Sequence, residues 1–133
     1  MEWSCWVKLS FSPSDNNMAR IYLLSDQQDL KGSLNGYYIK LGEGGSNDAI
    51  ELVRQSGNIH TVICRGTEGF VASSFAIKVK VVRTTGGNWT VYADQAGGSN
   101  YQLQATGTVK TFTAGNYSGV ECKITSCNRT KVY

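Results

Sequence analysis

Ten carboxylates are the first residues in this sequence that could do chemistry. A glycosidase needs two of them aimed at one bond, one as an acid and one as a base or nucleophile. Most of the ten fall among turn-forming residues. The nearest approach to a pair within an expected strand is Asp48 and Glu51, and alternation along a strand sends residues three apart to opposite faces. The carboxylates therefore do not predict glycoside hydrolysis.

The cysteines and the single histidine are the second candidate set. Zinc usually requires a close pair of ligands together with a second pair or with histidines. Only Cys122 and Cys127 are close together, with four residues between them, and His60 is the sole histidine. Cys5, Cys64 and Cys122 lie in runs of alternating apolar residues, as small buried hydrophobic side chains do. We therefore expect no zinc site and no enzyme, and a Cys122–Cys127 disulfide is left open.

Aromatic side chains beside charges are the third candidate set. The odd positions of residues 3–11 are apolar and are expected to be buried, which places Trp6 on the opposite face. If the strands are neighbours, Trp6, Tyr22 and Tyr38 form an aromatic stripe. Sugar rings stack on aromatic faces, and charged side chains contact their hydroxyls, so the candidate ligand-binding residues are Trp6, Tyr22, Tyr38, Lys40 and Glu51. The alternative is that these aromatics cover the second sheet or support loops.

The elements that must position these residues are β-strands. Apolar and polar residues alternate almost everywhere, and no stretch of ten residues has helical periodicity. A polar loop covers residues 25–34, with a single helical turn left open at 26–30. The expected strands span residues 3–11, 18–24, 35–41, 48–55, 59–65, 75–83, 89–93, 101–105, 109–112, 118–124 and 129–133. Many short strands at close spacing predict an all-β sandwich or barrel.

Two arginines lie inside these expected strands and carry a separate prediction. Arg20 and Arg54 each have apolar neighbours in sequence. An arginine in such a position lays its stem across the sheet and pairs with a carboxylate on an adjacent strand, for which Glu51 is the nearest candidate. We expect both arginines to be structural.

Length and charge exclude several classes of function. The chain has 133 residues, which is the size of one domain, and its 13 Lys and Arg against 10 Asp and Glu give a formal net charge of +3. This charge is too small for a protein that grips the phosphate backbone, so we expect no nucleic-acid partner. No apolar run approaches the roughly 20 residues that span a bilayer, so we expect no membrane insertion of this domain.

Several blocks of the sequence resemble a known family. The main one is W-x-K-L-x-F-S-P-S-x-x-N-x-A-R-I-Y-L-x-S-D, from Trp6 to Asp26, and it is supported by Leu34–Gly42, Asp48–Gly57 and Phe75–Arg83. Together they resemble the concanavalin A-like, laminin-G-like jelly-roll modules of secreted and surface proteins of Bacteroidetes. The resemblance implies an antiparallel two-sheet jelly-roll sandwich that lacks its terminal strands. It also implies an extracellular, periplasmic or cell-surface location.

The resemblance also raises calcium, since laminin-G-like modules sometimes hold this ion in a rim loop through carboxylate and carbonyl oxygens. Asp15 and Asn17 belong to one oxygen-rich loop and Asp26 to another. These three residues are the candidate metal ligands. The alternative is that they serve turn chemistry, and no other cofactor is expected.

The function predicted from all of this is that of a non-catalytic carbohydrate-binding or adhesion module, with a glycan or a surface protein as its partner. The alternative is a structural spacer or protein-interaction domain without a small ligand, and a glycoside hydrolase fragment is the third hypothesis. We expect residues 1–133 to form one jelly-roll domain excised from a longer protein, because both ends fall inside or next to expected strands.

Overall fold

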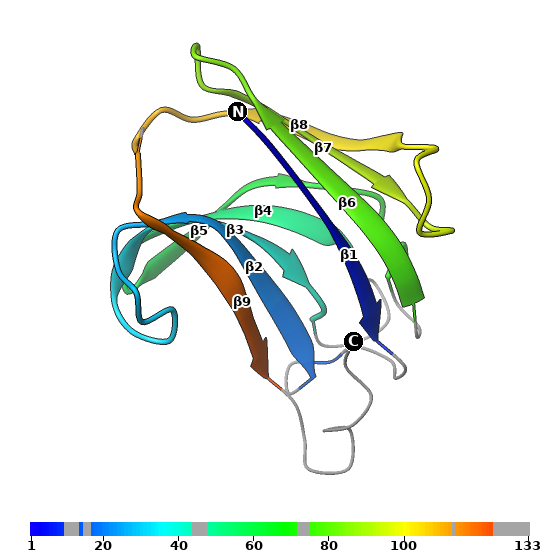
Figure 1. Ribbon diagram of the computed structural model, residues 1–133, viewed down its shortest axis with the longest axis horizontal. Helices are drawn as coiled ribbons and strands as arrows, with labels where there is room; N and C mark the ends of the chain where they lie inside the picture. Colours follow the sequence, from blue (N-terminus) through cyan, green and yellow to red (C-terminus); the bar gives the residue numbers. More distant parts are fainter. Residues whose placement is uncertain (10–13, 15–16, 44–47, 72–74, 113, 124–133) are drawn as a thin grey trace.

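The computed structural model describes residues 1–9, 14, 17–43, 48–71, 75–112 and 114–123, and these form two antiparallel β-sheets packed face to face (Figure 1). One sheet has four strands in the order β1-β6-β7-β8, and the other has five in the order β5-β4-β3-β2-β9. The strands are β1 (Glu2–Leu9), β2 (Met18–Ser25), β3 (Leu34–Leu41), β4 (Ile50–Gly57), β5 (Ile59–Arg65), β6 (Phe75–Arg83), β7 (Asn88–Asp94), β8 (Gln102–Thr108) and β9 (Tyr117–Lys123). The predicted all-β, two-sheet antiparallel sandwich is confirmed.

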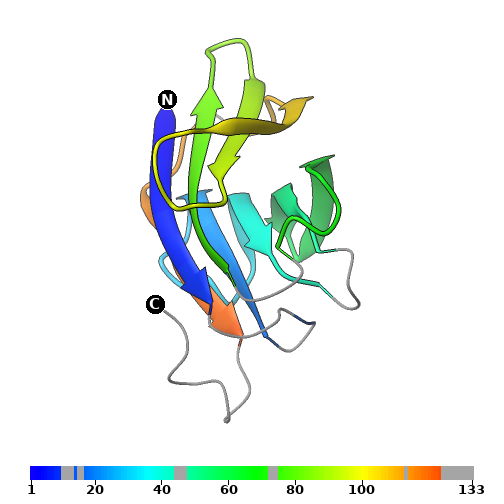
Figure 2. The same cartoon turned by 90° about the vertical axis from the view of Figure 1, so that its right-hand side faces the viewer.

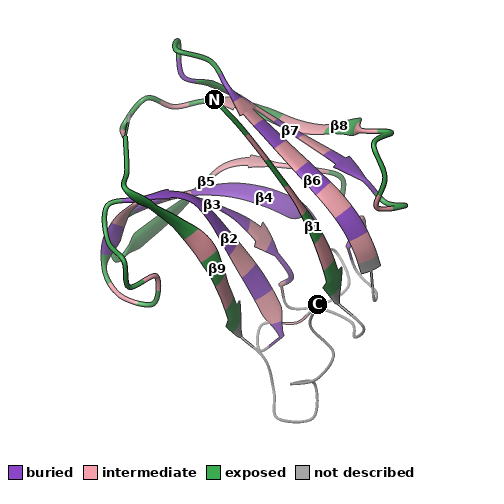
Figure 3. Cartoon of the chain, in the orientation of Figure 1, coloured by how far each residue is buried: buried purple, intermediate pink, exposed green. Residues whose placement is uncertain are grey.

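The core lies between the sheets and follows from period-two alternation. In β6, Ile77, Val79 and Val81 are buried, and the lysines between them face outward. The five-stranded sheet contributes the inward side chains of β2, β3 and β4, so Figure 3 shows these strands as the most buried part of the fold. Trp89 of β7 is fully buried, and its ring packs against those of Trp3 and Tyr37. Removal of such apolar surface from water is the main stabilising term.

The strand expected at residues 109–112 is wrong. This segment connects β8 to β9. One side-chain donor and one side-chain acceptor form hydrogen bonds with its backbone. The indole Nε1 of Trp89 donates to the carbonyl of Val109 at 3.1 Å, and the amide of Phe112 donates to the Tyr37 hydroxyl at 3.0 Å. Backbone groups bound in this way do not join a sheet ladder.

Two other expectations have different outcomes. Residues 26–30 form bends and a turn, without a helical turn. The strand expected at 129–133 lies outside the described residues.

The two long sides of the sandwich differ in how far the sheets stand apart. On one side β5 and β8 lie against each other. A Cβ atom on Gly107 of β8 would lie 2.8 Å from the Cγ2 atom of Ile63 in β5, so a larger residue would force Ile63 to shift. The opposite side is bordered by β1 of one sheet and β9 of the other (Figures 1 and 2).

Candidate functional site

Four of the five predicted ligand-binding residues share one surface, the outer face of the five-stranded sheet. Tyr22 of β2 lies opposite Tyr38 of β3, and Lys40 of β3 lies opposite Glu51 of β4. Trp6 does not join them, because β1 belongs to the four-stranded sheet and pairs with β6. The expected aromatic stripe through Trp6, Tyr22 and Tyr38 is therefore not formed.

The two tyrosines of this face are buried. Tyr22 is 1% exposed and Tyr38 is 2% exposed, and they pack with Leu34 and Val53 beneath Leu30 of the β2–β3 connection. Their burial raises the pKa of both phenols, that of Tyr38 to about 12. The tyrosines thus form a small second core in which a sugar ring has no open aromatic face to stack on.

Hydrogen bonds fasten the connection over this second core. The Tyr22 hydroxyl donates to Oε1 of Gln55 at 2.7 Å, and Nε2 of Gln55 donates to the carbonyl of Gly32 at 3.2 Å. The Tyr38 hydroxyl lies 2.9 Å from Nδ1 of His60. These contacts match the alternative in which the aromatics support a loop.

Lys40 and Glu51 belong to a network of ion pairs. Nζ of Lys40 lies 4.0 Å from one oxygen of Glu51, and Nη1 of Arg65 lies 3.2 Å from the other. Arg65 also forms a two-pronged pair with Glu43, and these carboxylates raise the pKa of its guanidinium. A ligand that used Lys40 or Glu51 would have to compete with partners already in place.

Arg20 and Arg54, the two arginines predicted to be structural, interact with residues other than Glu51. Arg20 of β2 pairs with Glu121 of β9 at 3.6 Å and stacks over the ring of Tyr38. Nη1 of Arg54 donates to the Thr111 hydroxyl at 2.9 Å. Glu51 is engaged by Lys40 and Arg65, as above.

The predicted metal ligands do not converge. Asn17 precedes β2 and Asp26 follows it, so the strand's whole length separates them. Nδ2 of Asn17 donates to the Ser14 hydroxyl, and both oxygens of Asp26 accept hydrogen bonds from Asn35, at 2.8 and 3.0 Å. Asp15 lies outside the described residues. No group of three or more His, Cys, Asp or Glu side chains among the described residues is arranged to hold a metal ion.

The cysteines of the described segments are free thiols. Burial raises the pKa of Cys5 and of Cys122, and that of Cys64 to about 11. A raised pKa keeps the sulfur protonated, which disfavours nucleophilic chemistry. Cys127 lies outside the described residues.

Trp6 stands on the outer face of the four-stranded sheet, where it is 50% exposed. On the same face the Lys80 ammonium lies 5.4 Å from the ring centres of both Tyr92 and Tyr101. A Cβ atom on Gly97 would lie 2.8 Å from Nε1 of Trp6, so the β7–β8 connection walls one side of the indole. Sequence analysis missed the two tyrosines, although Tyr92 alternates with buried residues of β7 as Lys80 does in β6.

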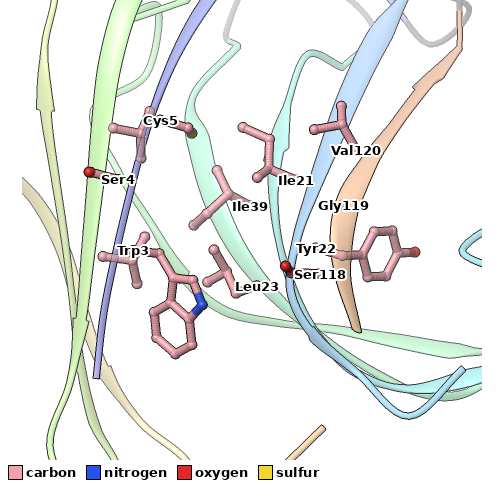
Figure 4. A pocket seen from close by; sticks show the side chains of 12 residues that line it. Trp3, Ser4, Cys5, Ile21, Tyr22, Leu23, Ile39, Ser118, Gly119 and Val120 are labelled. Carbon is pink, nitrogen blue, oxygen red and sulfur yellow. The ribbon is translucent and has the colours of Figure 1, made fainter. Parts of the chain in front are cut away.

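An apolar depression, which we call the apolar groove, lies on the side of the sandwich bordered by β1 and β9. We call this side the open side. A cavity of about 150 Å³ lies between the sheets there, and a second one of about 280 Å³ shares with it Cys5, Ile21 and Val120. Figure 4 shows side chains from both sheets converging on the first cavity, while the ring of Tyr22 points away from it. The inner part of the wall is formed by Trp3, Cys5, Ile21, Leu23, Ile39 and Val81. Val120 at the rim is 61% exposed.

An unpaired backbone edge runs along the same side. Met1 donates to the carbonyl of Arg83 and accepts from its amide, so odd-numbered residues of β1 direct their backbone groups toward β6. The even-numbered residues Glu2, Ser4, Trp6 and Lys8 therefore direct theirs away from the sheet. Within the part of the chain that the structure describes, no strand pairs with this edge. A free edge beside an apolar groove is able to accept another strand.

Comparison with known proteins does not narrow the choice: no family model, curated protein or solved structure matches this chain. Among the described residues, no helix has the length and apolar character needed to cross a membrane. The function of the candidate site must therefore be inferred from its geometry alone.

Proposed function

We propose that this chain is a non-catalytic protein-interaction module that accepts an extended polypeptide segment along β1, above the apolar groove. The observation that carries the proposal is the coincidence of two features on one side of the fold. The outward backbone groups of β1 pair with no strand among the described residues and lie at the spacing of a strand, and the groove beside them offers apolar surface.

The composition of the groove favours a polypeptide over a sugar or another small polar ligand. No charged side chain occurs among the described residues that line its two cavities. Its two adjoining cavities, of about 150 and 280 Å³, form one apolar depression along Trp3–Val7 of β1. It suits alternate apolar side chains of an added strand, which would project from one face into the groove.

The test uses peptides of eight residues, selected for binding to this chain from a displayed random library. Titration into the isotopically labelled chain should shift the NMR signals of the Glu2, Ser4, Trp6 and Lys8 amides. The variant Ser4→Pro removes one outward N–H group and leaves the β1–β6 bonds in place, so it should weaken binding about tenfold or more. Ser4→Ala keeps the N–H group and serves as the matched control. If no peptide is selected, or if Ser4→Pro binds as tightly as Ser4→Ala, the proposal is wrong.

A carbohydrate-binding function is the second candidate, and the exposure of Trp6 favours it. This indole, the Tyr92 and Tyr101 rings and Lys80 share one outward face, which supplies both the apolar surface and the donors that sugars use. On a glycan array, binding that disappears in Trp6→Ala and persists in Tyr22→Phe would support it. Binding that is absent, or that Trp6→Ala leaves unchanged, would exclude it.

We also propose that the chain is a concanavalin A-like, laminin-G-like jelly-roll module that works outside the cytoplasm. The motifs between Trp6 and Arg83 support this, and so does the coarser two-sheet sandwich that they predict. An antibody raised against the chain should label the envelope or the medium of the cells that express it. Labelling restricted to the cytosol would contradict the proposed location.

A further inference from the structure

The charges of β1 are symmetric about its centre. Glu2 and Lys8 are equally distant from Cys5, and both project from the outer face of the four-stranded sheet. If two copies of β1 pair antiparallel about Cys5, Glu2 of each copy lies opposite Lys8 of the other. Resting on the proposed function, we propose that the polypeptide accepted by the β1 edge is β1 of a second copy of this chain, in the register that pairs Glu2 with Lys8.

The backbone independently selects the same register. Only the even-numbered residues of β1 direct N–H and C=O groups outward, so an antiparallel partner must place even positions opposite even positions. Pairing about Cys5 matches Glu2 with Lys8 and Ser4 with Trp6, which uses all four outward residues of each copy. Pairing about Ser4 or about Trp6 uses only three of them and leaves both Glu2 and Lys8 without an opposite charge.

Side chains on both faces fit this arrangement. On the inner face, Trp3 of one copy lies opposite Val7 of the other, an aromatic residue beside a β-branched one, which is a favourable cross-strand pair. These inward side chains extend the apolar wall that Trp3, Cys5 and Val7 already give to the groove. Lys8 also interacts within its own chain, but an ammonium has three donors and can hold Glu2 of the second copy as well.

The proposed register has a chemical signature at its centre. Cys5 would face Cys5 of the second copy in a non-hydrogen-bonded pair, where Cα atoms lie about 4.5 Å apart, within the range of about 4.4–6.8 Å that a disulfide bridges. Oxidised glutathione, added at a pH high enough to ionise part of the buried Cys5 thiol, should therefore trap the dimer. One Cys5 thiolate attacks the glutathione disulfide and releases one glutathione thiol. The second Cys5 thiolate then attacks the mixed disulfide and releases the other, so that the two cysteines are oxidised while glutathione is reduced.

The experiment measures the dimer dissociation constant of the full chain by sedimentation equilibrium, at low salt and under reducing conditions. Glu2→Lys places two like-charge pairs in the interface and should weaken the dimer about tenfold or more. The double variant Glu2→Lys with Lys8→Glu restores opposite charges and should recover most of the affinity. Ser4→Pro should abolish the dimer, whereas Ser4→Ala should not. Thermal melting of each variant verifies that it is folded.

The trapping experiment identifies the register. Under oxidised glutathione the wild-type dimer should become covalent through Cys5, as peptide mapping shows, and Cys5→Ser should dimerise without becoming covalent. A dimer that is indifferent to Glu2→Lys, or that is not trapped at Cys5, would overturn the proposed register. If the chain stays monomeric at millimolar concentration, the proposal that a second copy pairs with β1 is wrong. This holds even if another segment protects the β1 amides. If that monomer still binds the selected peptides at β1, the proposed function survives, and if it does not, both fail.

Discussion

The two long sides of the sandwich are built from similar apolar residues but differ in packing. The β5–β8 side is closed, and the β1–β9 side is open. On the β5–β8 side, a Cβ atom on Gly107 would lie 2.8 Å from Cγ2 of Ile63 and 3.4 Å from Cβ of Cys64, so the sheets pack closely there. On the β1–β9 side, equally apolar inward residues such as Cys5 and Val120 line a groove. Apolar alternation thus decides which face a residue takes, but it does not decide whether two sheet edges meet.

Both edge strands of the closed side have an irregular pairing, whereas only one edge strand of the open side does. The pairing of β4 with β5 and that of β7 with β8 each contain a register shift. A bulge increases the twist of its strand and bends it, which helps to carry β5 and β8 toward each other. On the open side, the pairing of β1 with β6 is regular over eight residues, while the pairing of β2 with β9 also contains a register shift.

The largest expected effect would break the closed side. Gly107→Val places a branched side chain where a Cβ atom already lies 2.8 Å from Ile63. Overpacking of this kind should lower the free energy of unfolding by about 1–3 kcal/mol, measured by chemical denaturation. Val120→Ala, at an exposed position on the open side, is the control and should change it by less than about 0.5 kcal/mol. Equal losses in the two variants would mean that the sides do not differ in packing.

Thiol reactivity should sharpen the same contrast. Burial raises the pKa of Cys64, on the closed side, to about 11, so at pH 8 its thiolate fraction is about a hundredfold below that of an ordinary thiol. Cys122, on the open side, is exposed. Iodoacetamide should therefore modify Cys122 about tenfold faster than Cys64 in the folded chain, with peptide mapping to assign each label. Equal rates would contradict the closed packing around Cys64.

A smaller loss of stability should show whether the second core, on the outer face of the five-stranded sheet, excludes water as the β5–β8 side does. Tyr22→Phe removes the donor to Oε1 of Gln55 and leaves that buried oxygen without this bond. We expect a loss of about 1 kcal/mol in the free energy of unfolding. Tyr117→Phe, at an exposed ring of β9, is the matched control and should be neutral. If the two variants are equally stable, the second core is open to water.

A separate effect concerns alkaline pH. The folded-state pKa of Tyr38 is about 12, against 10 for the ordinary phenol, so the folded chain holds this proton more tightly than the unfolded chain. The corresponding stability is fully present below about pH 10 and is lost as the pH rises toward 12. Melting temperatures measured across this interval should fall, and they should fall less in Tyr38→Phe. A parallel decline in both proteins would assign the loss to other groups.

Sequence reasoning recovered the elements whose pattern is local. The predicted strands 59–65 and 75–83 coincide with β5 and β6, and in 75–83 the alternation of apolar residues with lysines leaves little freedom. It failed at 109–112, where the competing partners are Tyr37 and Trp89, side chains that lie far away in sequence. Period-two alternation carries no information about such partners.

The candidate site was recovered in part for the same reason. The neighbouring positions of Tyr22 and Tyr38 follow from adjacent strands, and their burial does not, because a loop covers them. Trp6 projects away from the odd positions of β1 as expected, but it does not join Tyr22 and Tyr38, since the partner of β1 is β6, whose pairing no local pattern specifies. The apolar groove depends on the spacing of two sheet edges, which alternation does not encode.

The pairing of β2 with β9 joins residues about 100 positions apart, such as Ile21 and Val120. During synthesis at about 5–20 residues per second, β2 would therefore leave the ribosome roughly 5–20 s before its second neighbour exists. For that interval the inner strand of a finished sheet is an exposed edge on a nascent chain. Such non-local topology favours slow folding, and it makes the order in which the strands emerge a determinant of whether the new chain folds or aggregates.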